Sequence, residues 1–138
     1  MKFLSLFFMV NQALPSFAND AKHGEAFFKE KRYGEAAESF LQAEIDDPDE
    51  LKHSYNRGVS ALFEKNFDAA VEAFEKSFQS EDEALKKKSL FNLGHAQYGK
   101  GDYEASLKAF EEYLKKDPES EEAKENKAWV EKRIEPNI

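Results

Sequence analysis

Apolar residues recur at helical spacing along most of the chain, in segments separated by short polar links. Side chains three or four positions apart share one helix face, so this spacing predicts amphipathic helices. In chain order the pattern predicts helices over residues 20–31 and 34–45, two in 51–80 meeting at Asn66, two in 82–118 meeting at Gly101, and one over 119–134. Asp20 is the expected N-cap of the first helix, and Pro48 is expected in the first turn of the third.

A glycine, an aromatic residue and a phenylalanine recur in a constant arrangement three times. The three sets are Gly24, Tyr33 and Phe40; Gly58, Phe67 and Phe74; and Gly94, Tyr103 and Phe110. Every member shifts by 34 residues between the first two sets and by 36 between the last two, so a single insertion separates them. Small residues join the same register at Ala36, Ala70 and Ser106. A period of 34 with such columns is typical of a helix–turn–helix repeat.

The repeated glycines call for a packing explanation. A glycine inside a helix costs about 1 kcal/mol relative to alanine, so its recurrence indicates close helix–helix approach. We expect the small residues to let the two helices of a repeat come together, and the aromatic residues to fill the space between neighbouring repeats. One such repeat cannot bury its apolar face alone, so stacking supplies the stability.

On these columns the chain resembles the tetratricopeptide repeat family over residues 17–120. The resemblance implies an all-α solenoid with a right-handed superhelix: repeats at 19–50, 51–84 and 85–120, then a capping helix and tail at 121–138. In this family the first helix of each repeat lines a concave groove that binds a protein segment. By column, the groove here is Phe28, Tyr55, Asn56, Val59, Phe63, Phe91, Asn92, His95 and Tyr98, with Glu25 beside Phe28. The alternative is that several of these aromatics pack between helices and the groove is unused.

Some family members hold a C-terminal carboxylate with lysine and asparagine in repeat one and lysine and arginine in repeat three. Here Ala21 and Glu25 occupy the first pair of positions, Lys88 and Asn92 the second, and Asn56 matches in repeat two. The clamp is incomplete, which disfavours recognition of chaperone tails. Since the net charge is −8, we expect an apolar or basic partner segment rather than an acidic one.

Residues 1–18 differ from the rest of the chain. A positive start at Lys2, an apolar run over residues 3–10 and small residues at Ser16 and Ala18 predict a secretory signal peptide cleaved after Ala18. The chain has no cysteine, hence no lipid-attachment site. The expected location is the periplasm or the medium, with no stable membrane anchor after cleavage.

Residues 85–134 further resemble the repeat proteins of bacterial Bat (aerotolerance) operons, in which a helix carrying an Ala-x-x-Asn motif, here Ala123 to Asn126, follows the repeats. This implies an exported scaffold or adaptor in an envelope or stress-tolerance complex. A self-associating structural protein and an accessory subunit of an envelope-biogenesis machine remain alternatives, and the oligomeric state stays open.

Nothing in the sequence predicts catalysis. It has no cysteine nucleophile and no glycine-rich phosphate loop, and His23, His53 and His95 are dispersed over the repeats. The acidic run at 46–50 lacks the glycine and spaced oxygens of a calcium loop. We expect no catalytic residue, cofactor or metal site, and the acidic composition argues against a nucleic-acid partner.

Overall fold

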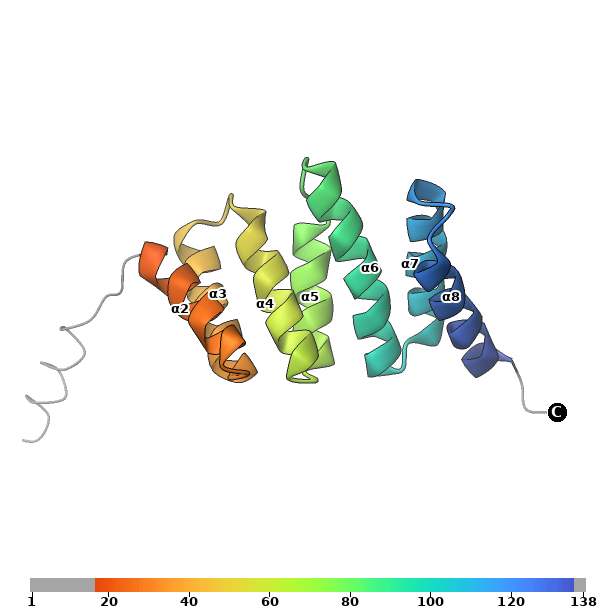
Figure 1. Cartoon of the computed structure of the whole chain (residues 1–138), viewed down its shortest axis with the longest axis horizontal. Coiled ribbons are helices and arrows are strands. Elements are labelled where there is room, and N and C mark those ends of the chain that lie inside the picture. The colour runs from red at the N-terminus through yellow and green to blue at the C-terminus, as the bar shows by residue number, and fades with distance from the viewer. Residues whose placement is uncertain (1–16, 136–138) are drawn as a thin grey trace, which may run out of the picture.

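The computed structural model describes residues 17–135, which form seven α-helices and no strand within that range. The helices are α2 (Phe17–Lys29), α3 (Tyr33–Asp46), α4 (Leu51–Phe63), α5 (Phe67–Ser77), α6 (Glu83–Lys100), α7 (Tyr103–Lys116) and α8 (Glu121–Ile134). They follow one another along the long axis from α2 to α8 (Figure 1). The predicted all-α solenoid is confirmed. Most of the predicted signal peptide, residues 1–16, lies outside the described residues.

Each helix packs mainly against the helices before and after it, and α4 also touches α6. The chain therefore folds as three antiparallel helical hairpins, α2–α3, α4–α5 and α6–α7, followed by α8. The last helix packs on α7 as α4 packs on α3 and α6 packs on α5. It thus takes the place that the first helix of a fourth repeat would occupy.

The repeated glycines are contact points inside each hairpin. A Cβ added at Gly58 would lie 2.7 Å from the Phe74 ring, and one at Gly24 or Gly94 would lie 2.8 Å from Phe40 or Phe110. Each phenylalanine packs against the glycine of its own repeat and also borders the next one: Phe40 shares a hollow with Asn56 and Val59, and Phe74 shares a buried cluster with Leu93 and Ala96. The aromatic column that holds Tyr33 and Phe67 also bridges repeats. The ring centroids of Tyr33 and Phe63 are 5.1 Å apart, and the Phe67 ring packs on Gly99.

Local side chains set the helix starts. Asn66, Asp82, Asp102 and Ser120 accept hydrogen bonds from backbone N–H groups in the first turns of α5, α6, α7 and α8. Asp20 is not the N-cap of α2, which begins at Phe17; Asp20 lies buried in its first turn. Pro48 lies in the turn before α4 rather than in its first turn, and Glu50 caps that helix.

The turn inside each repeat needs a left-handed residue. Gly101 has φ 88°, and the matching positions of the first two repeats hold Lys31 at φ 61° and Lys65 at φ 64°. This explains why α2 ends at Lys29, two residues before the predicted boundary. Glycine adopts such a φ without strain, whereas lysine does not.

A buried ion network joins repeats one and two. Arg57 donates from Nε to Glu44 at 2.6 Å and from a terminal nitrogen to the other Glu44 oxygen at 3.2 Å. Lys76 donates to the same carboxylate at 2.6 Å, and Glu72 approaches Arg57 at 3.4 Å. Burial alone would raise the pKa of Glu44, but the hydrogen bonds and charges of Arg57 and Lys76 outweigh it and lower that pKa.

Candidate functional site

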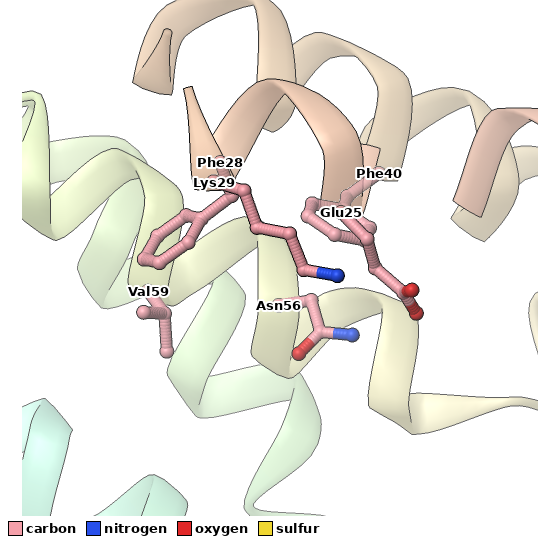
Figure 2. A pocket seen from close by; sticks show the side chains of 6 residues that line it. All are labelled: Glu25, Phe28, Lys29, Phe40, Asn56 and Val59. Carbon is pink, nitrogen blue, oxygen red and sulfur yellow. The ribbon is translucent and has the colours of Figure 1, made fainter. Parts of the chain in front are cut away.

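The first hollow on the wall formed by the first helices of the repeats lies between α2 and α4. It has a volume of about 270 Å³ and is lined by Glu25, Phe28, Lys29, Phe40, Asn56 and Val59. Figure 2 shows Phe28 and Lys29 extending from α2 toward Asn56 and Val59 of α4. Apolar walls with an amide and two opposite charges at the rim suit an apolar side chain carried on a polar backbone.

The second hollow, of about 550 Å³, lies between α4, α6, α7 and α8. Its lining is Tyr55, Ala84, Lys87, Lys88, Phe91, Asn92, Tyr113 and Glu122. Asn92 donates from Nδ2 to the Tyr55 hydroxyl at 3.1 Å, which leaves the phenolic proton able to donate to another group. Lys87 pairs with Asp117 at 3.1 Å, whereas Lys88 is exposed at the rim.

The third hollow, of about 170 Å³, lies between α6 and α8, where His95 and Tyr98 meet Asn126, Trp129 and Val130. A hydrogen bond of 3.3 Å joins His95 to Asn126, and Arg133 donates to the Tyr98 hydroxyl at 3.2 Å. Burial lowers the pKa of His95, and the nearby charge of Glu122 opposes this only in part. His95 and Tyr98 therefore serve largely to seat α8.

The predicted groove residues fall into separate groups rather than one continuous cavity. Phe28, Asn56 and Val59 share the first hollow; Tyr55, Phe91 and Asn92 share the second; His95 and Tyr98 face α8 in the third. Phe63 lines none of these hollows; it packs edge-on against Phe28 at 5.4 Å and is 56% exposed.

The sequence analysis did not include several side chains that line the hollows. These are Lys29, Lys87, Tyr113, Glu122, Asn126 and Trp129. The sequence did contain a signal for Asn126 and Trp129. Ala128 follows Gly94 by 34 residues, the repeat length, which places α8 in the position of the first helix of a further repeat. Tyr113 comes from the second helix of its repeat, and no column spacing indicates that it reaches the wall.

Family models and relatives agree with this geometry. Two family models described as tetratricopeptide repeat match residues 22–84 and 88–120. The chain belongs to the tetratricopeptide repeat family. A curated relative, the Hsp70-Hsp90 organising protein of Plasmodium falciparum, is 26% identical over 99 residues, which is 68% of this chain and only 18% of that protein.

Solved tetratricopeptide structures share the fold. The second such domain of human RPAP3, solved in complex with an HSP70 peptide, superimposes with a TM-score of 0.73 at 19% identity, over 84% of this chain and 98% of that one. MamA from Desulfovibrio magneticus superimposes with a TM-score of 0.77 at 20% identity, over 86% of this chain and 66% of that one. At such identities the likeness concerns the fold alone.

No helix in the described part of this tetratricopeptide repeat protein is long and apolar enough to cross a membrane. Within the same residues no three histidine, cysteine or acidic side chains come together as ligands for a metal ion.

Proposed function

We propose that this tetratricopeptide repeat protein is a scaffold, not an enzyme, that binds an extended segment of a partner protein across α2, α4 and α6. The observation that carries the proposal is the pair of hollows on the first-helix wall, one between α2 and α4 and the next between α4 and α6. An extended segment can place one side chain in each hollow while its backbone crosses α4.

The first hollow supports an apolar anchor. Phe28, Phe40 and Val59 provide its walls, and the Asn56 amide carries both a donor and an acceptor for a peptide backbone. Burying a side chain of valine or leucine size contributes about 1.5–3 kcal/mol, enough to decide which segment binds.

The second hollow supports a polar contact next to that anchor. The Tyr55 hydroxyl accepts from Asn92 and keeps its own proton for a ligand, while Lys88 lies exposed at the rim. Both groups favour an acceptor oxygen of the bound segment. The peptide complex of the RPAP3 domain and the relationship to a chaperone organising protein support a peptide partner in general.

A selection from an unbiased peptide library tests the proposal. Enriched peptides are synthesised with a fluorophore and titrated by anisotropy against the wild type, Val59→Lys and the matched control Ile45→Lys. Ile45 is 62% exposed on α3 and lies outside the three hollows. We expect Val59→Lys to weaken binding about tenfold or more and Ile45→Lys to leave it unchanged. Equal loss in both variants, or no enriched peptide, refutes the proposal.

We further propose that residues 1–18 direct export, so that the scaffold works in the periplasm or outside the cell as part of an envelope or stress-tolerance complex. The apolar run over residues 3–10 and the small residues at Ser16 and Ala18 support this. N-terminal sequencing of the protein recovered from an osmotic-shock fraction tests it. A first residue of Asn19 is expected; recovery of the uncleaved chain from the cytoplasm contradicts it.

A further inference from the structure

One face of α8 is largely open to solvent in the described chain and carries both apolar and charged side chains, with Asn126 and Trp129 at the edge nearest α6. Glu125, Asn126, Ala128, Trp129 and Lys132 line a hollow of about 370 Å³, and all five belong to this one helix. Trp129, the only tryptophan of the chain, is 60% exposed there. Tryptophan is one of the residue types that contribute most to interface energies, so Trp129 can anchor a contact.

The position of Ala128 shows what kind of contact this surface can make. In each preceding repeat, a glycine in the same column lies against a phenylalanine of the following helix. A Cβ added to that glycine would lie only 2.7–2.8 Å from the nearest ring carbon. Ala128 holds the corresponding place in α8 and is exposed. The face is therefore shaped for a second helix to approach closely, and no helix in the described chain does so.

The charged residues on this face of one copy can pair with the same residues of a second copy in antiparallel orientation. Glu125 lies one turn before Ala128 and Lys132 one turn after it, so the two charges are about 10 Å apart along the axis. The ion pairs that α8 makes within the described residues join Lys124 to Glu121 and Lys127 to Glu131, and use neither Glu125 nor Lys132.

We propose that α8 is a self-association surface on which two copies of this chain pair through antiparallel α8 helices about a two-fold axis. The axis passes between Ala128 and Trp129, so Glu125 of each copy faces Lys132 of the second copy. Trp129 of each copy covers Ala128 of the second copy. A two-fold contact of this kind closes on itself and yields a dimer rather than a filament.

The contact leaves the proposed peptide site free. Its residues line neither hollow of that site: the hollow between α2 and α4 lies in the first two repeats, and the second hollow takes only Glu122 from α8. One helix pair buries less area than a standard interface, so the dimer is a weak one that forms at high protein concentration. Two copies joined in this way present two peptide sites, which raises the avidity for a partner with repeated segments.

Sedimentation equilibrium over a range of concentrations, together with Trp129 emission, tests the proposal in the full chain. We expect dimerisation accompanied by a blue shift of the emission, since association buries the only tryptophan. Glu125→Lys and Lys132→Glu are each expected to raise the dimer dissociation constant about tenfold, because each places like charges opposite one another twice. Both residues are exposed, so helix content is expected to stay unchanged.

Mixing the two variants supplies the decisive control. In a mixed pair both facing positions again carry opposite charges, so association is expected to return to the wild-type level. A wild-type monomer at all concentrations overturns the proposal, and so do growth into open-ended assemblies and a mixture no tighter than its components. Peptide titrations of the same variants are expected to match the wild type, so a failure here is separable from a failure of the peptide site.

Discussion

Replacing Arg57 by methionine removes the charge that neutralises a buried carboxylate. Arg57 and Glu44 are 5% and 4% exposed, and two hydrogen bonds hold them together across the boundary between repeats one and two. After the replacement Glu44 keeps only Lys76, whose side chain is 55% exposed. Methionine retains most of the volume of arginine, so the change tests charge rather than packing.

The expected loss follows from that remaining lysine. Breaking a buried ion pair by removing one partner costs about 3–5 kcal/mol. Because Lys76 still donates to the carboxylate, we expect the lower end, a free energy of unfolding reduced by about 3 kcal/mol and a melting temperature lowered by roughly 10 °C. Replacing both partners, as in Glu44→Leu with Arg57→Met, leaves no uncompensated buried charge and is expected to leave the free energy of unfolding unchanged or raised.

Urea unfolding followed by circular dichroism measures these differences. Glu72→Gln serves as the matched control: it removes a partner 3.4 Å from Arg57 whose side chain is 63% exposed, and is expected to cost less than about 1 kcal/mol. Since the pKa of Glu44 is lowered in the folded chain, the ion network stabilises the fold above the ordinary carboxylate range. That stabilisation is lost as the pH falls below 4.5 through the folded-state pKa. A loss below about 1 kcal/mol in Arg57→Met, or a double variant as unstable as the single one, would refute the reasoning.

Three further predictions concern the packing of α8 on α6, the turn between α4 and α5, and the peptide groove. The pKa of His95 is lowered by burial, so folding favours its neutral form. The protection factors of the α8 amides, which correct for the intrinsic pH dependence of hydrogen exchange, are expected to fall as the pH drops below about 6.5, and less so in His95→Gln. Lys65→Gly relieves a positive φ and is expected to raise the free energy of unfolding by about 1 kcal/mol in urea titrations; a loss of stability contradicts this. Combining Ala21→Lys, Glu25→Asn and Asn92→Arg completes the carboxylate clamp of the family. Calorimetry is expected to show binding of an acidic chaperone-tail peptide with a free C-terminus only in the triple variant, and amidation of the peptide should abolish it.

Much of the fold could be predicted because its causes are local and periodic. The spacing of Gly58, Phe67 and Phe74 predicts a hairpin in which one helix closely approaches another, and the structure shows the glycine against the phenylalanine. Asn66 and Asp82 predict helix starts because their side chains bond to the backbone only two or three residues away. Asp20 misled the prediction of the first boundary, since a short polar residue inside a helical turn resembles a cap in sequence.

The site was harder to predict, because its geometry depends on contacts between residues far apart in the chain. The hydrogen bonds from Asn92 to Tyr55 and between His95 and Asn126 join residues 37 and 31 positions apart, and they decide which predicted groove side chains still face solvent. Column spacing assigns the groove to the first helix of each repeat. It does not show that the wall divides into separate hollows.

The sequence alone determined the number of helices over the described residues, their pairing into hairpins and the close helix approach at the repeated glycines, because helix periodicity and a constant repeat length encode them. Only the tertiary structure decided that Arg57 and Glu44 form a buried pair, that α8 packs at the end of the repeats, and that Trp129 borders the hollow beside α6 yet stays exposed. These features depend on how successive hairpins are rotated against one another. That rotation is the sum of many small side-chain contacts between repeats, and no single residue type or spacing records it.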